Sequence, residues 1–420
     1  MTKAFIFFYL VALLVRPQDW VEPIIGLPTT ILITLPLFVA GLVVYMRDRA
    51  RFQVPHNWLL PVYVLFIFIS TTVTNDSATG LEQAVLFLKR TLAFFPILWI
   101  INTPERASYA IKCYMLIIVF LAYQAILQAQ TGYSWGGMTR MPGYVEIRVR
   151  WHGDWDGPNV YAILFLIGIA FAMEHLFGPY GVGMRLWALV VVSLSCVAIY
   201  FTNSRGAVMA LMAMTAYYFK DRFSKPVAIG LAVAMISGVL LLGPSRMSEV
   251  NTKEESAAER SWLWEQGLTM LRHSPVFGVG RGQFAKRADL GLIAHNNYVQ
   301  NFAETGLPGF FLFIALIWFS GKAGYLLAQV KTAVDPLAAS FGRMMAGCLI
   351  GYCVVTFFVV MELELLYFVL ALCMAIYSTY RAKLSELPLL AMTRGDALAV
   401  SGIMAAILTA IYLIAVKGIV

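Results

Sequence analysis

One histidine of the chain stands where an enzyme can use it as a base. His295 lies in the segment AHNNYVQNFAETGLPG (294–309), between a charged region and a long apolar run. Because histidine takes and returns a proton near neutral pH without a large pKa shift, His295 is the candidate general base. The alternative is a histidine that caps a helix or is held by hydrogen bonds. We expect a helix over 295–305 that stops at Gly306, with Glu304 on the face opposite His295 and structural.

A single arginine occupies an unfavourable position in the segment FTNSRGAVMA. Asn203 or Ser204 can cap a helix that begins near Gly206, which places Arg205 in its first turn. The positive end of the helix dipole repels an arginine there by up to about 1 kcal/mol, so an anion is expected to compensate. Amides and a guanidinium together would bind a phosphate or diphosphate. The alternative is an arginine that extends to lipid headgroups.

A second arginine precedes an expected surface helix in AAERSWLWEQGLTMLRHSPVF (257–277), which we expect to lie on the membrane. Arg260 stands at its start, and Trp262 and Trp264 are either interfacial anchors or a platform against which a sugar stacks. The residues at helical spacing that indicate this helix are Leu263, Gly267, Met270 and Leu271.

A third arginine lies in a glycine-rich segment, GVGRGQF. Gly278, Gly280 and Gly282 flank Arg281 closely enough for backbone amides to approach an anion. No Lys-Ser or Lys-Thr pair follows, so the segment is not a nucleotide-binding P-loop, and a plain turn is the alternative.

Lys89 and Arg90 in LEQAVLFLKRTLAFFPILWII are the charges placed deepest in an apolar stretch. Ionisable groups inside a membrane are costly enough to indicate function, and these two would complete an anion site. If residues 81–90 form an interfacial helix instead, both side chains lie at the surface. The sequence leaves both interpretations open.

The segment RVRWHGDWDGPNVYA (148–162) supplies Arg148 and Arg150 as further candidate substrate ligands. Its Asp-Gly-Pro-Asn part predicts a turn into the next span. His152, Asp154 and Asp156 are metal ligands by type, but one histidine and two aspartates in a turn have little specificity. We expect no metal site.

The composition requires these residues to be carried by membrane helices. The chain has 420 residues, of which 60% are hydrophobic and 13% charged, with a mean hydropathy of +0.75. Soluble domains do not reach these values, and several apolar stretches have the roughly 17 to 25 residues that a spanning helix needs. We expect an all-α polytopic membrane protein with 12 or 13 transmembrane helices, the apolar run 4–15 being retained rather than cleaved. The expected spans are 3–15, 27–46, 58–74, 83–102, 113–130, 158–177, 186–201, 206–219, 226–243, 309–328, 341–361, 364–380 and 397–416.

One orientation places every short basic connection on the cytoplasmic side, with the N-terminus also inside. The two long loops, 131–157 and 244–308, then face the periplasm, and long loops are exempt from the charge rule. Residues 1–420 form one membrane domain without an internal repeat, and all five cysteines lie in apolar runs as free thiols. The basic residues of the short connections are Arg47, Arg49, Arg51, Arg106, Lys112, Arg185, Lys220, Arg222, Lys225, Lys322, Lys331, Arg381, Lys383 and Arg394.

The order of these motifs resembles that of the O-antigen ligase and polymerase superfamily. Arg205 at the outer end of a span is followed by an Arg-x-x-x-Trp surface helix, by Pro-x-x-Gly-x-Gly-x-Gly-x-Phe over 275–284, and by His295-Asn296 before a Glu-x-Gly-x-x-Gly stretch. The resemblance is most specific over about 148–309. RPQDW at 16–20 resembles the O-glycosylation ligase branch that is associated with exosortase systems.

The resemblance implies a GT-C-like membrane glycosyltransferase that needs neither metal nor cofactor. Its donor would be a preassembled glycan on undecaprenyl diphosphate, and its acceptor a hydroxyl, lipid A-core in the first instance. Arg205, Arg260 and Arg281 would stabilise the leaving diphosphate, and His295 would take the proton, which gives inversion at the anomeric carbon. Asn296 and Trp262 would contact substrate. Membrane lipids are expected around the protein, in the bacterial inner membrane, and nucleic acid is not expected as a partner.

Four alternatives stay open at this point. Within the family, the enzyme could be an O-glycosylation ligase that acts on protein, or a polymerase that joins glycan repeat units. From another class, a lipid-linked glycan transporter would need charges along a path through the bilayer, whereas the charges here collect on one side. A structural scaffold would tolerate glutamine at Arg205 and His295.

Overall fold

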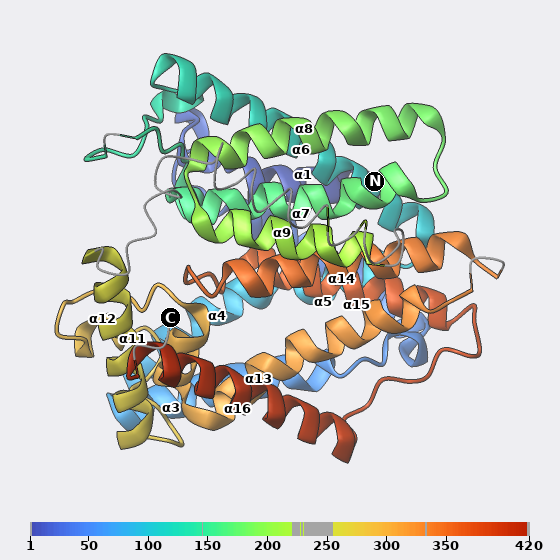
Figure 1. Cartoon of the computed structure of the whole chain (residues 1–420). Coiled ribbons are helices and arrows are strands. Elements are labelled where there is room, and N and C mark those ends of the chain that lie inside the picture. The colour runs from blue at the N-terminus through green and yellow to red at the C-terminus, as the bar shows by residue number, and fades with distance from the viewer. Residues whose placement is uncertain are drawn as a thin grey trace.

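The computed structural model describes residues 2–144, 146–220, 255–331 and 334–417, together with residues 227 and 230, and this part of the chain is helical without a β-strand. Helices lie side by side along one common direction, as an all-α polytopic membrane protein requires (Figure 1). Their bounds are α1 (Thr2–Leu10), α2 (Thr29–Arg47), α3 (His56–Thr74), α4 (Ser77–Thr91), α5 (Phe94–Ile100), α6 (Pro104–Thr131), α7 (Pro158–Phe177), α8 (Val182–Thr202), α9 (Arg205–Phe219), α11 (Glu255–His273), α12 (Phe284–Arg287), α13 (Asn297–Ala328), α14 (Pro336–Val355), α15 (Glu364–Arg381) and α16 (Arg394–Ala415).

Within the described residues, nine helical segments are long and apolar enough to cross a membrane. Apart from 226–243, of which only residues 227 and 230 are described, each expected span coincides with helical structure. Several boundaries differ, and α6 and α13 begin well before the spans expected at 113–130 and 309–328. The span expected at 83–102 is divided between α4 and α5, and the span expected at 341–361 ends at Val355. The residues that follow, 356–363, form a loop between α14 and α15, which we call the α14–α15 loop.

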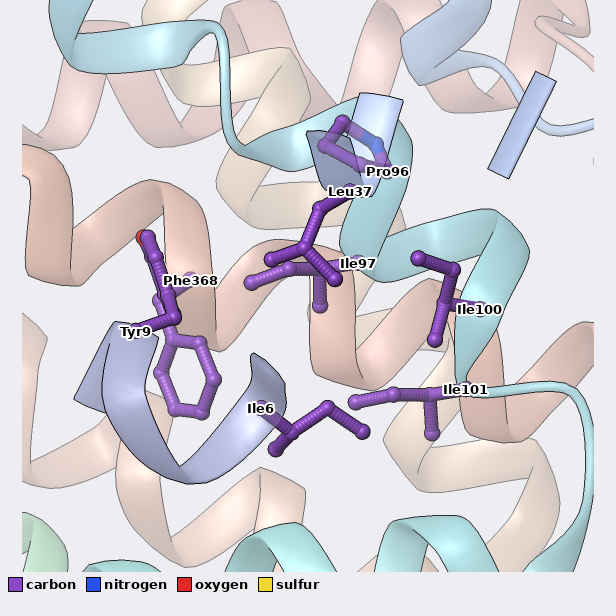
Figure 2. Close-up of a pocket in the computed structure, with 8 residues that line it drawn as sticks. All are labelled: Ile6, Tyr9, Leu37, Pro96, Ile97, Ile100, Ile101 and Phe368. Atoms are coloured by element: carbon purple, nitrogen blue, oxygen red, sulfur yellow. The ribbon is translucent and has the colours of Figure 1, made fainter. Parts of the chain in front are cut away.

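The helix α15 lies at the centre of the bundle. Every residue from Leu365 to Tyr380 is buried, because this helix is apolar on all sides. A cavity of about 10 Å³ remains between α1, α2, α5 and α15, and Figure 2 shows the side chains that line it, among them Leu37, Ile97 and Ile100. It is apolar and no larger than one water molecule, so it holds no substrate.

The two ends of the bundle differ in their chemistry. At one end, the connections that the sequence places inside come together: the Arg51 guanidinium donates to the carbonyl of Asn102, and Arg381 Nη2 donates to the Ala50 carbonyl at 2.9 Å. At the other end lie α11, α12, the first long loop and the C-terminal end of α16 (Figure 1). The short connections that carry Arg51 and Arg381 therefore lie together at one end of the bundle.

The first long loop is held by the segment that follows α1. Trp151 Nε1 donates to the Val15 carbonyl at 2.8 Å, and Trp155 Nε1 donates to the Leu13 carbonyl at 3.2 Å. Arg16 bridges this contact, because its guanidinium pairs with Asp154 at 2.6 Å and also with Asp19. The segment around RPQDW and the loop at 148–156 are thus joined by hydrogen bonds and an ion pair.

Candidate active site

The turn between α8 and α9 places Arg205 at a helix N-terminus. Asn203 adopts the left-handed conformation at φ 53°, and Ser204 Oγ accepts from the Ala207 amide at 3.3 Å, which makes Ser204 the cap. Gly206 packs so closely that a Cβ there would lie 2.9 Å from Phe358 Cβ. The N-terminus of α9 therefore lies against the α14–α15 loop. The sequence predicted the helix cap but did not predict this contact.

His295 directly precedes the cap of α13. Asn296 Oδ1 accepts from the amides of Tyr298 at 2.9 Å and Val299 at 3.1 Å, so asparagine, not histidine, caps the helix. The helix begins at Asn297 rather than at 295. His295 adopts φ 51°, a left-handed conformation that costs a non-glycine residue about 1–2 kcal/mol. Such strain persists where the surroundings hold the residue firmly, as happens at functional sites.

A helix forms at the predicted place, as α11, and packs against α13. Trp264 is 5% exposed, its Nε1 donates to the Ala294 carbonyl at 3.0 Å, and its ring lies 5.2 Å from that of Phe357. Gly267 allows the two helices to approach, since a Cβ there would lie 2.4 Å from Val299 Cγ1. Trp262 is 47% exposed and remains a candidate sugar contact or membrane anchor.

The electrostatics of the site favour a neutral histidine. Burial lowers the pKa of the half-buried His295, the positive charge of Arg260 lowers it further, and Glu259 opposes both. A pKa below the ordinary value near 6.5 leaves the imidazole uncharged at pH 7, the form that accepts a proton. Arg260, on α11, is thus close enough to His295 for its charge to act on the ring.

Three segments that are distant in the sequence converge on the α14–α15 loop. Phe358 packs on Gly206 at the start of α9, and the Phe357 ring lies 5.2 Å from Trp264 of α11. The amide of Asn297, at the start of α13, donates to the Thr356 carbonyl at 2.9 Å. One loop therefore gathers the elements that carry Arg205, Arg260 and His295.

The segments that carry Arg205, Arg260 and His295 fall within one region that is similar to a known family. Residues 189–314 match the family model described as O-antigen ligase. The chain carries an O-antigen ligase domain. This domain contains Arg205, Arg260 and His295, whereas RPQDW at 16–20 lies outside it. No curated protein matches the chain. The chain is a multi-pass membrane protein with a ligase- or polymerase-type glycosyltransferase domain.

Arg281, also in the O-antigen ligase domain, is buried among carboxylates. Its Nη1 lies 2.8 Å from Glu362 Oε2, and its Nε lies 3.7 Å from Glu304 Oε2. Burial acts to lower the pKa of Arg281, but the carboxylates outweigh it and raise that pKa. The guanidinium also lies over the Phe87 ring, 5.8 Å from its centre. Glu304 is buried, and its Oε1 accepts from the Phe284 amide at 3.3 Å.

Amides of the glycine segment around Arg281 bond within the protein, which favours the turn over the anion site among the two interpretations of this segment. The Val279 amide donates to the Ala303 carbonyl at 2.8 Å, and the Gly280 amide donates to the Glu304 carbonyl at 3.0 Å. These carbonyls lose their helical partners because α13 breaks at Gly306, where φ is 63° and ψ is −170°. The amides of Val279 and Gly280 therefore form hydrogen bonds with carbonyl groups at the break in α13 and do not bind a ligand.

Arg148 and Arg150 lie near the end of α8, because the Val149 amide donates to the Phe201 carbonyl at 3.1 Å. Arg148 is buried with its guanidinium 4.5 Å from the centre of the Tyr144 ring, and Arg150 pairs with Asp156 at 2.6 Å. Among the described residues there is no group of three His, Cys, Asp or Glu residues that could hold a metal.

Lys89 and Arg90 are exposed on α4, while Phe87 of the same helix is buried. Phe87, and neither of these two residues, is the side chain of α4 that contacts the Arg281 guanidinium. The structure places neither of them against His295.

Buried polar atoms without a protein partner mark the neighbourhood of the two helix N-termini. Within the described part of the chain, Asn203 Oδ1, Asn296 Nδ2 and Asn297 Nδ2 have no hydrogen-bond partner. An unpaired buried polar atom costs about 1–3 kcal/mol and requires an explanation. These atoms flank Arg205 and His295 and are suited to hold a polar ligand.

Sequence reasoning missed Glu362. It lies in VVMELELL, where a carboxylate within an apolar run was a signal for a buried partner. Glu362 pairs with Arg281, which lies far from it in the sequence, so no local pattern could show the pairing.

Proposed function

We propose that this protein transfers a preassembled glycan from undecaprenyl diphosphate to an acceptor hydroxyl without a metal ion. The observation that carries the proposal is that the segments bearing Arg205, Arg260 and His295 all pack against the α14–α15 loop. A proton acceptor next to cations suits a reaction that releases a proton on one side and a diphosphate on the other.

The reaction has one displacement step. The acceptor hydroxyl attacks the anomeric carbon, and the bond from that carbon to the diphosphate oxygen breaks with its electron pair. His295 takes the hydroxyl proton, and Arg205 and Arg260 stabilise the charge that develops on the diphosphate. Direct displacement inverts the anomeric configuration.

The remaining candidate ligands extend the site. Asn296, with its unpaired Nδ2, adjoins His295, and Trp262 offers an exposed ring on α11. Arg148 and Arg150 approach from the first long loop, and Lys89 and Arg90 would act from α4 on a lipid-linked substrate. We assign Arg281 a different role, given below.

We place the reaction at the periplasmic face of the bacterial inner membrane. The short basic connections gather at the end opposite α11 and the long loops, and such connections stay in the cytoplasm. The lipid carrier then presents its diphosphate at the outer leaflet.

The test is transfer by the purified protein in detergent or liposomes. Undecaprenyl-diphosphate-linked glycan is offered with lipid A-core, with a peptide hydroxyl, or with more donor. Transfer to lipid A-core identifies a ligase, transfer to peptide an O-glycosylation ligase, and chain growth a polymerase. No transfer to any acceptor, with vesicle-to-vesicle movement of the donor instead, supports a transporter.

A further inference from the structure

We propose that Arg281, clamped between Glu304 and Glu362, is a positioning residue that holds the backbone on both sides of His295 and does not touch the substrate. The expected effect on glycan transfer rests on the proposed function, whereas the expected effect on the position of His295 does not. The cluster, which we call the Arg281 node, consists of Arg281, Glu304 and Glu362.

The first connection from the node reaches the residue before His295. Gln300 Nε2 donates to Glu304 Oε1, and Gln300 Oε1 accepts from the Ala294 amide at 2.9 Å. The Ala294 carbonyl is fixed in turn by Trp264 of α11. Through Gln300, the node therefore sets where Ala294 lies.

The second connection reaches the residues after His295. Glu362 belongs to the α14–α15 loop, and the amide of its neighbour Met361 donates to Asn297 Oδ1 at 3.1 Å. Asn301 Nδ2 also donates to Glu362 Oε2 at 3.1 Å, which ties the loop to the next turn of α13. The ion pair with Arg281 thus fixes the loop that holds Asn297.

A left-handed histidine needs such restraint. With φ at 51°, His295 would relax to an ordinary conformation if either neighbour were released. Relaxation would move the ring relative to Arg260, whose charge now acts on it. The node supplies restraint from both sides, through atoms that belong to three separate chain segments.

The charge of the node argues against a role as diphosphate ligand. Two carboxylates and one guanidinium give a formal charge of −1, and the Arg281 side chain is only 11% exposed. A diphosphate at Arg281 would have to displace or approach two negative groups, which is unfavourable in a buried environment.

The experiment uses the full-length protein in detergent and two readouts. In the first, modification of His295 by diethyl pyrocarbonate is followed by mass spectrometry from pH 5 to 8, which gives the apparent pKa of the imidazole without requiring activity. Arg260 and Glu259, both on α11, are the charged groups that act on it. In Arg281→Gln we expect this pKa to rise towards the ordinary value, because the ring leaves its buried place beside Arg260.

Arg281→Gln alone leaves two buried carboxylates without a cation and could fail to fold. The variant Arg281→Gln/Glu362→Gln avoids this, because it keeps the formal charge of the node at −1. We expect it to show the same rise, because the loop is still released. Arg281→Lys, which retains the charge, should restore most of the wild-type pKa. The matched control is Arg343→Gln, which breaks the ion pair of Arg343 with Glu174, 2.9 Å apart on α14 and α7. It should leave the pKa of His295 unchanged.

The second readout separates positioning from binding. In Arg281→Gln we expect kcat to fall by up to about 100-fold, as for a misplaced catalytic group, while the Kd for undecaprenyl diphosphate stays within about twofold. A Kd that rises as far as in Arg260→Ala would overturn the proposal, and so would an unchanged pKa of His295 in both node variants. If the wild-type protein transfers no glycan, the proposed function fails, and the modification experiment still decides the role of Arg281.

Discussion

Arg260 of α11 and His295 before α13 lie close enough for the guanidinium to lower the pKa of the imidazole. The pair is unfavourable once His295 takes a proton, because two cations then face each other. A leaving diphosphate removes this conflict, since its developing charge attracts both groups. Proton uptake and departure of the diphosphate are therefore expected to support each other in one transition state.

The first prediction concerns pH. Because the folded pKa of His295 is lowered, the neutral form persists below pH 6.5, and activity should be lost only as the pH falls through this lower value. Arg260→Gln should move the acid limb of the kcat/KM profile upwards, since a positive neighbour is removed. Glu259→Gln, the matched control, should move it downwards. If the acid limbs of the two variants moved in the same direction, or did not move, the result would contradict the electrostatic effect of Arg260 on His295.

A second prediction concerns His295 itself. Asparagine tolerates the left-handed conformation that His295 adopts, so His295→Asn should keep the fold and the melting temperature close to wild type. Loss of general base catalysis should lower kcat by about 10²- to 10⁴-fold, measured as glycan transfer by the purified variant. Near-normal transfer by a folded His295→Asn protein would be incompatible with the assignment of the base.

The third prediction concerns the diphosphate. A charged hydrogen bond contributes about 1.5–3 kcal/mol, so Arg205→Ala should weaken undecaprenyl diphosphate binding by about 10- to 100-fold. Calorimetry or fluorescence quenching in detergent would measure the change. Lys322→Ala, which removes a cation paired with Asp396 on α16, serves as control and should bind normally. Equal binding by Arg205→Ala and wild type would argue against a diphosphate at the N-terminus of α9.

A fourth prediction concerns the break in α13. Gly306 has φ 63°, and a Cβ there would lie 2.4 Å from the Val276 carbonyl oxygen. Gly291 has a similar φ of 67° but open space around it. Gly291→Ala should cost only the backbone strain of about 1–2 kcal/mol, whereas Gly306→Ala should also displace the backbone at Pro275 and Val276. Thermal unfolding should show a larger loss of stability in Gly306→Ala than in Gly291→Ala. Similar losses would mean that the backbone near Val276 moves aside at little cost.

Local patterns predicted much of the fold. Apolar runs indicated the spans, Ser204 was recognised as a possible cap, and Gly306 was expected to stop a helix, because these signals depend on neighbouring residues alone. For the opposite reason, the sequence could not decide whether the glycine segment is an anion site or a turn. Its amides bind carbonyls that are exposed only by the break at Gly306, and the sequence does not show which distant acceptor an amide will meet.

The candidate site was predictable in its residue types and not in its assembly. His295 and Arg205 were recognisable from chemistry and helix position. The α14–α15 loop that gathers them was expected to be part of a helix, and Glu362 was missed. Both depend on packing between segments that lie far apart in the chain.

The most direct measurement is transfer of glycan from undecaprenyl diphosphate by the purified protein in the presence of EDTA, with the anomeric configuration of the product read by NMR. The account predicts an inverted linkage formed without metal, and loss of that product in His295→Asn. A retained configuration, a requirement for metal, or undiminished product from His295→Asn would contradict it.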